Sequence, residues 1–175
     1  MKTKGQEEEA AAILEQFEVS RPPVSVEEIA RKLGAHIAYE PFEGNVSGLL
    51  YRKDDRVIIG VNTSHASVRQ RFTIAHEIGH WRLHGKKEMF VDNLVRVDFR
   101  DDRASAGTDQ EETQANAFAA SLLMPREMIL SELKSRGSSE ADDADALVGE
   151  LAERFEVSRQ AMEYRLVNLG LRGHV

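Results

Sequence analysis

The stretch of sequence that decides the fold is RFTIAHEIGH, residues 71–80. Its two histidines, His76 and His80, are four residues apart, so in a helix they lie one turn apart on the same face. Two imidazoles placed in this way can converge on one tetrahedral zinc ion, which lowers the pKa of a bound water to about 7. Glu77 lies one position round the helix from His76 and can accept the remaining proton of that water. The H-E-x-x-H spacing therefore predicts a hydrolytic metal site.

A simpler interpretation is a pair of surface histidines on an amphipathic helix. The neighbouring residues argue against it, because most of them are apolar and indicate a helix that is buried over much of its surface. Imidazoles inside such a helix need polar partners. Gly79 costs about 1 kcal/mol relative to alanine in a helix, and close approach of a second helix would explain it. The apolar neighbours are Phe72, Ile74, Ala75, Ile78, Trp81 and Leu83.

A catalytic zinc ion needs three protein ligands and an open position. The sequence contains no cysteine, so the third ligand must be a carboxylate or a further histidine. Glu112 is the best candidate, because Ala115 and Ala119 share its helix face and would let that helix pack closely on the metal helix. Glu111 and Asp109 are the rivals. Nitrogen and oxygen ligands also accept manganese and other divalent ions, so the sequence leaves the identity of the metal open.

The composition is that of a globular protein and excludes several classes. The 175 residues suffice for one compact domain, or for a domain with a small helical appendix. The net charge of −7 argues against coating of nucleic acid by charge alone. No apolar run reaches the roughly 18 residues of a membrane-spanning helix, and the acidic N-terminus does not resemble a secretion signal. We therefore expect a cytoplasmic location.

The pattern along the chain predicts an α+β fold with a small antiparallel sheet of about three strands. Helices are expected at 7–18, after Ser25 as far as Gly34, at 65–84 for the metal helix, at 110–123 for the ligand helix, and at 146–155 and 158–169; strands are expected at 35–39, 47–52 and 56–61. Residues 86–110 are expected to be irregular. The predicted organisation is a metallopeptidase domain at 1–134, a linker at 135–145 and a helical tail at 146–175.

The tail has the pattern of a helix-turn-helix, with Ser158 as the first residue before its second helix. In a DNA-binding module Arg159, Gln160 and Arg165 would contact DNA. However, basic and acidic residues balance in this stretch, whereas DNA-reading modules usually carry a basic surplus. We therefore favour a helical pair that packs on the rest of the protein, and direct DNA binding stays open.

Two long motifs resemble the ImmA/IrrE family of metallopeptidases: residues 71–80, and ETQANAFAASLLMP at 112–125. The resemblance implies a zincin-like fold in which His76, His80 and Glu112 bind zinc and Glu77 is catalytic. It also implies a protein substrate, since known members in bacteria and phages cleave a helix-turn-helix transcriptional repressor and switch on stress or mobile-element genes. Better-known members include longer proteins with further C-terminal domains.

Several finer expectations accompany this hypothesis. One of the strands 47–52 and 56–61 would lie at the sheet edge and pair with an extended peptide substrate. Asn116 would support a metal ligand or be a buried amide, and His84 would pack against or cap the metal helix. Tyr51 and His84 are weak candidates for stabilising an oxyanion. The alternative function is a metal-binding regulator that uses the tail helices on DNA.

Overall fold

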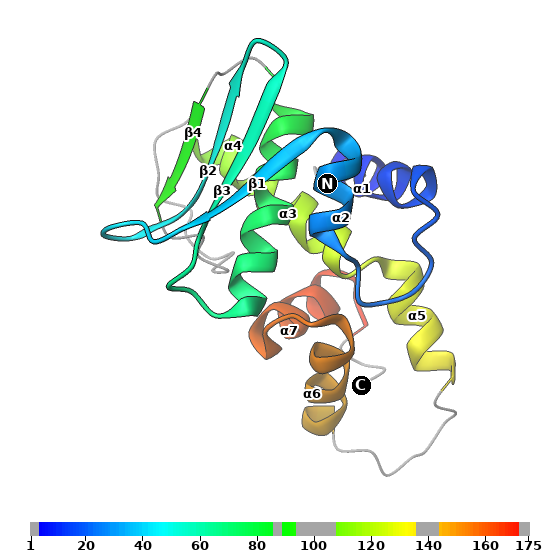
Figure 1. The fold of residues 1–175 in the computed structure, drawn as a ribbon. Helices are drawn as coiled ribbons and strands as arrows, with labels where there is room; N and C mark the ends of the chain where they lie inside the picture. Colours follow the sequence, from blue (N-terminus) through cyan, green and yellow to red (C-terminus); the bar gives the residue numbers. More distant parts are fainter. Residues whose placement is uncertain (1–3, 86–88, 94–107, 136–143, 172–175) are drawn as a thin grey trace.

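A single sheet of four strands forms one layer of the part of the chain that the structure describes (Figure 1). The structure is a computed structural model, and it describes residues 4–85, 89–93, 108–135 and 144–171. The strands are β1 (Ala35–Glu40), β2 (Val46–Lys53), β3 (Arg56–Asn62) and β4 (Met89–Asn93), and they lie in the order β1-β3-β2-β4.

The predicted antiparallel pairing holds for only part of this sheet. β2 and β3 form an antiparallel hairpin, whose turn residues Asp54 and Asp55 have φ of 47° and 62°, as a tight hairpin turn requires. β1, in contrast, pairs with β3 in parallel, because both strands run opposite to β2, which lies between them in the sequence. Strand order is a long-range property, and local patterns do not define it.

Two further expectations for the sheet were wrong. β4 lies within the stretch that was expected to be irregular, and it pairs antiparallel with β2. Consequently β2 and β3 are interior strands, and neither of the two candidates, 47–52 and 56–61, lies at an edge. Within the described sheet the edges are β1 and β4.

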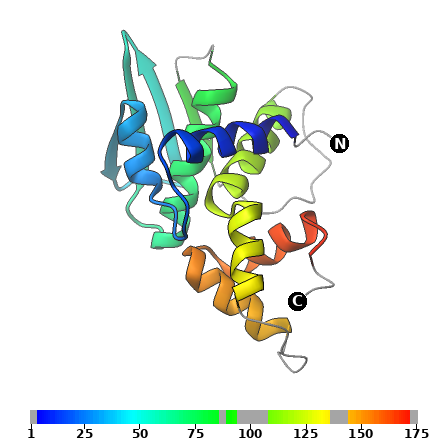
Figure 2. The same ribbon diagram turned by 90° about the vertical axis from the view of Figure 1, so that its right-hand side faces the viewer.

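Helix α3 (Ser67–Leu83) covers one face of the sheet, and α4 (Thr108–Leu123) lies on the side of α3 away from the sheet (Figure 2). α3 packs against β2 and β3, and α4 packs against α3. α3 begins later than expected, after Ala66 as its N-cap. The backbone N–H of Ser64, the expected cap, instead donates to Asn62 Oδ1 at 2.9 Å. The two motif-bearing helices therefore lie side by side behind the sheet.

With one exception, the remaining helices follow the predicted order closely. They are α1 (Lys4–Gln16), α2 (Val26–Leu33), α5 (Arg126–Ser135), α6 (Ala144–Phe155) and α7 (Arg159–Asn168). The exception is α5, which begins after Pro125 and for which the sequence left a helix or a turn open. Gly34 ends α2 in the left-handed region, with φ of 99°, as predicted. Ser158 caps α7 by accepting a hydrogen bond from the Ala161 N–H, whereas Ser25 makes no such bond to α2.

One hydrophobic cluster runs through the described chain from α1 to α7. Figure 1 shows α6 and α7 beside the N-terminal end of α3, and Phe155 and Met162 are completely buried there. The tail helices thus share a core with the metal helix, as the packing interpretation expects. The division into 1–134, 135–145 and 146–175 stays a prediction. Among the described residues, no helix combines the length and apolar character needed to cross a membrane.

Candidate metal centre

His76 and His80 are completely buried on α3 and face each other. Their Nε2 atoms are 2.9 Å apart, because the four-residue spacing places the two rings one helical turn apart. The His80 ring also stacks on Phe90 of β4, with ring centroids 4.5 Å apart. The edge strand β4 therefore forms one wall beside the two histidines.

Helix α4 brings Glu112 to the same point. Its Oε2 lies 3.3 Å from His76 Nε2, and its Oε1 lies 3.3 Å from His80 Nε2. One potential ligand atom from each of the three residues falls within a group whose members are all within 4.8 Å of one another. The structure thus brings together the three residues that the sequence analysis selected as metal ligands.

Glu112 is favoured over its rival Glu111 by position. The carbonyl oxygen of Glu111 is 3.2 Å from His84 Nε2, and Glu111 does not belong to the group of potential ligands. The side chain of Asp109 lies outside the described part of the structure. Within that part, the cluster of His76, His80 and Glu112 is the one group able to hold a metal ion.

The close approach of α3 and α4 depends on Gly79. A Cβ atom at this position would lie 3.0 Å from Phe118 Cδ1 and 3.2 Å from both Cα and the carbonyl oxygen of Ala115. Ala115 and Ala119 are fully buried in the same contact. The prediction that Gly79 and small residues of the ligand helix allow tight packing is confirmed.

Asn116, one turn after Glu112, fixes the His76 ring. The Nδ1 and Oδ1 atoms of this pair are 2.9 Å apart, and an amide oxygen can only accept, so Nδ1 carries the proton and donates it. When the His76 ring is neutral, its lone pair is therefore on Nε2, which points toward His80 and Glu112. Metal-binding histidines commonly have such a partner on the second ring nitrogen.

The negative charge of Glu112 also suits the binding of a metal ion. Burial acts to raise the pKa of its carboxyl group, but hydrogen bonds with His76 and His80, and then their positive charge, outweigh burial and lower the pKa well below its usual value. The carboxyl group is consequently ionised at neutral pH. An ionised oxygen is the form that binds a cation.

The spacing of these atoms fits a small divalent cation. Around a tetrahedral ion with bonds of about 2.0 Å, ligand atoms are separated by about 3.3 Å. One Glu112 oxygen lies at this distance from each nitrogen, Oε2 from His76 and Oε1 from His80, while the two nitrogens, at 2.9 Å, are slightly closer. Two imidazole nitrogens and one carboxylate oxygen form a donor set that zinc accepts.

Glu77 is also completely buried, but it lies on another side of α3. Its Oε1 faces Gly48 of β2, so the carboxylate lies between the helix and the sheet. It does not belong to the ligand group.

A family comparison decides the classification. The family model described as the IrrE N-terminal-like domain, a peptidase family, matches residues 30–167. This chain belongs to that family. The matched range starts in α2 and ends in α7, so it includes the sheet, both motif-bearing helices and most of the tail. The resemblance of the two motifs to ImmA/IrrE metallopeptidases is thereby confirmed.

Two relatives are radiation response metalloproteases named IrrE. The protein of Deinococcus radiodurans is 34% identical over 109 residues, which cover 62% of this chain and 30% of the relative. That of Deinococcus deserti is 34% identical over 116 residues, which cover 66% of this chain and 37% of the relative. The chain thus spans about a third of the length of each of these two IrrE proteins.

The sequence analysis missed the contribution of β4. The short apolar run Met89-Phe90-Val91 was the available signal, but three residues are too few to distinguish a strand from a loop. Phe90 has no motif around it, and only the pairing of β4 with β2 brings it against His80.

His84 and Tyr51 were the candidates for stabilising an oxyanion, and they lie in different surroundings. His84 Nε2 lies 3.2 Å from the Glu111 carbonyl oxygen, and its ring centroid is 5.6 Å from that of His80, in agreement with a packing or capping role. Tyr51 is three residues beyond Gly48 in β2, and strand alternation places it on the opposite face from the helices. Tyr51 is therefore not a candidate for stabilising an oxyanion at this centre.

The tail residues that were candidates for contacting DNA differ in how deeply they are buried. Arg165 is buried; its Nε donates to the Met124 carbonyl oxygen at 3.0 Å and its Nη1 pairs with Glu7 at 2.9 Å. Arg159 is more exposed but pairs with the Asp145 carboxylate. Gln160 is exposed. Arg165 is thus a structural contact between helices and cannot read DNA in this fold.

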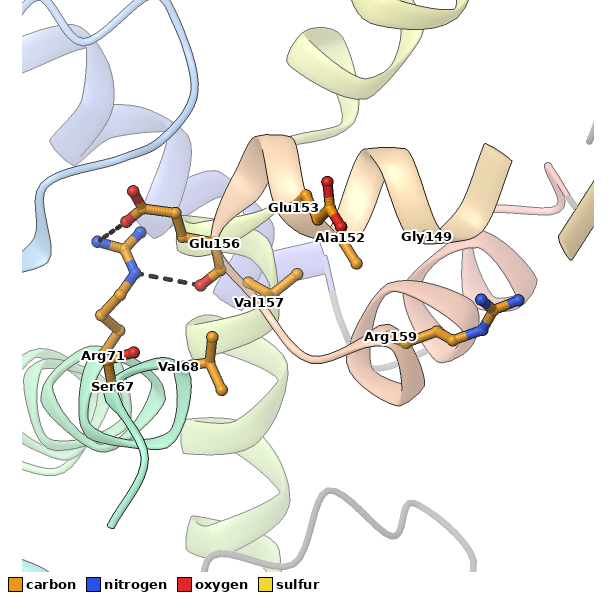
Figure 3. Close-up of a pocket in the computed structure, with 9 residues that line it drawn as sticks. All are labelled: Ser67, Val68, Arg71, Gly149, Ala152, Glu153, Glu156, Val157 and Arg159. Atoms are coloured by element: carbon orange, nitrogen blue, oxygen red, sulfur yellow. Dashed lines mark hydrogen bonds and ion pairs between the residues drawn. The ribbon is translucent and has the colours of Figure 1, made fainter. Parts of the chain in front are cut away.

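Figure 3 shows where the tail meets the metal helix. Arg71 of α3 donates to the Glu156 carbonyl oxygen at 3.2 Å and pairs with the Glu156 carboxylate at 3.3 Å. An open pocket of about 710 Å³ lies beside this contact. None of the residues that line it belongs to the histidine and glutamate cluster.

Proposed function

We propose that this chain is a zinc-dependent endopeptidase in which His76, His80 and Glu112 bind the metal and Glu77 is the general base. The observation that carries the proposal is the convergence of the three side chains at 3.3 Å and 2.9 Å beside a separately held buried carboxylate. Membership of a family of metallopeptidases supports it. Manganese is the alternative metal, because the ligands are nitrogen and oxygen atoms.

Each residue has a defined task in this mechanism. When bound, zinc supplies Lewis acidity that polarises the scissile carbonyl and acidifies a water molecule. The Glu77 carboxylate accepts the proton of the attacking water and then donates it to the leaving amine. Asn116 holds the proton of His76 on Nδ1, so the Nε2 lone pair stays directed at the metal position.

We infer that the substrate binds as an extended strand along β4. This strand is an edge of the described sheet, and an edge strand is where an extended peptide can add to a sheet. Phe90 places the strand directly against His80, while Met89 and Val91 are 57% and 47% exposed. β4 thus takes the role that the sequence analysis gave to the interior strands.

The proposed substrate is a helix-turn-helix transcriptional repressor in the cytoplasm, whose cleavage would switch on stress or mobile-element genes. The motif resemblance supports this proposal, and two relatives are named for a radiation response. The alternative, a metal-binding regulator that contacts DNA through α6 and α7, is weakened by the burial of Arg165.

The decisive experiment uses the variant Glu77→Gln. Because Glu77 lies outside the ligand group, we expect the variant to retain one zinc ion per chain while proteolysis falls by at least about a thousandfold. Zinc-loaded wild type and variant would each be added to a bacterial lysate, and new peptide N-termini counted by mass spectrometry. Equal cleavage by the two proteins would refute the mechanism. Tight, salt-sensitive binding of duplex DNA by the whole protein would favour the alternative.

A further inference from the structure

Gly48 of β2 lies where the strand passes closest to α3. An added Cβ atom would overlap Thr73 Cγ2 and would lie 2.9 Å from the Gly60 carbonyl oxygen and 3.0 Å from Glu77 Oε1. Real Cβ atoms essentially never approach other atoms so closely. The missing side chain thus leaves the space that Thr73 and the Glu77 carboxylate occupy.

A positive φ does not explain this glycine. Gly48 is not among the described glycines with positive φ, and it pairs with Val61 of β3 and Asp92 of β4. A glycine inside a strand weakens the strand and often marks close approach of another group. The register between β2 and β4 also shifts at Val46 and Gly48, which bends the strand locally.

We propose that Gly48 is a positioning residue for Glu77: the bare backbone of β2 forms the wall against which the carboxylate rests. A larger residue at this position would push the carboxylate along or away from α3. The inference rests on the proposed function, in which Glu77 moves the proton of the attacking water. A displacement of about 1 Å in such a group can reduce turnover about a hundredfold.

Gly60 of β3 provides a matched control. An added Cβ atom there would also be crowded, at 2.8 Å from Leu49 Cγ and 3.0 Å from Phe42 Cζ. These contacts do not include Glu77. An effect of general crowding in the sheet would appear at both glycines, whereas an effect through the Glu77 carboxylate would appear only at Gly48.

The test is a double-mutant cycle on the thermal stability of the metal-free protein. All variants carry Thr73→Ser, which removes Cγ2 and so relieves the worst overlap at position 48. Gly48→Ala should lower the melting temperature by about 5 °C when Glu77 is present, and by less than half as much when Glu77→Ala is also present. Gly60→Ala should lower it equally with and without Glu77→Ala. Equal losses for Gly48→Ala in both backgrounds would overturn the proposal.

A second measurement addresses turnover, with labelled casein as the probe. Relative to Thr73→Ser alone, Gly48→Ala in the same background should retain one zinc ion per chain and keep KM within about twofold, while kcat falls at least tenfold. An unchanged kcat would also overturn the proposal. If the wild type does not cut casein, the stability cycle decides the role of Gly48, and the comparison of wild type with Glu77→Gln in lysate decides the proposed function.

Discussion

The imidazole of His76 is held at both of its ring nitrogens. Nδ1 donates to Asn116, and Nε2 faces Glu112 and His80. A ring fixed in this way is directed at the metal position before any ion binds. At the scale of single residues, the cluster therefore depends on a carboxylate from α4 and on a supporting amide one turn further along that helix.

Glu112→Ala should abolish or greatly weaken zinc binding, because two ligand nitrogens cannot by themselves hold the ion tightly. Glu111→Ala is the matched control, since it removes the neighbouring carboxylate that lies outside the cluster. Metal content would be measured on purified protein after dialysis against a weak chelator. Zinc lost from Glu111→Ala but kept by Glu112→Ala would show that the third ligand is wrongly assigned.

Asn116→Ala should weaken zinc binding by about 10- to 100-fold, because the His76 ring loses the partner that fixes its tautomer and orientation. Gln114→Ala, on the same helix and also partly buried, should leave the affinity unchanged. Competition with a chromophoric chelator measures both constants. Equal affinities in the two variants would make Asn116 an ordinary buried amide.

At the scale of elements, the centre is the contact between two helices. α3 and α4 approach closely only because Gly79 faces Ala115, and this approach brings Glu112 within reach of both histidines. The edge strand β4 then completes the surroundings of His80 through Phe90. A substitution at the contact between α3 and α4 should therefore weaken metal binding, even though none of the three clustered side chains is replaced.

Gly79→Ala should lower the free energy of unfolding by about 1–3 kcal/mol and also weaken zinc binding, since the added methyl group would push Ala115 and Phe118 away. Gly149→Ala in α6 is the control, because its Cβ would meet only the Arg159 Nη1 atom, at 3.4 Å. That change should be neutral or stabilise by up to about 1 kcal/mol. Urea denaturation and zinc titration would test both variants, and a stable Gly79→Ala protein with normal zinc affinity would contradict this account of the contact.

At the scale of the whole molecule, two arginines, one buried and one partly buried, join the tail to the rest of the chain. Arg165 of α7 contacts both the C-terminal end of α4, through the Met124 carbonyl oxygen, and α1, through Glu7. Arg71 of α3 joins the metal helix to the turn between α6 and α7 (Figure 3). These contacts make the tail a structural part of the described fold.

Arg165→Met should lower the free energy of unfolding by about 2 kcal/mol, because it leaves the buried Met124 carbonyl oxygen without its donor. Arg159→Met should change it by no more than about 1 kcal/mol, since the side chain of Arg159 is 47% exposed. Urea denaturation monitored by circular dichroism compares the two. Equal small losses would mean that α7 is only loosely attached.

From the sequence alone, the described helices other than α5, the α+β class, the family and the cluster of His76, His80 and Glu112 could be predicted. These features rest on short-range chemistry: a four-residue histidine spacing, small residues on one helix face, and glycine or serine at helix ends. The sheet order, the parallel pairing of β1 with β3, the edge position of β4 and the burial of Arg165 were decided only by the tertiary structure. Each of these depends on contacts between segments far apart in the chain. A local sequence pattern does not reveal the free energy of such contacts.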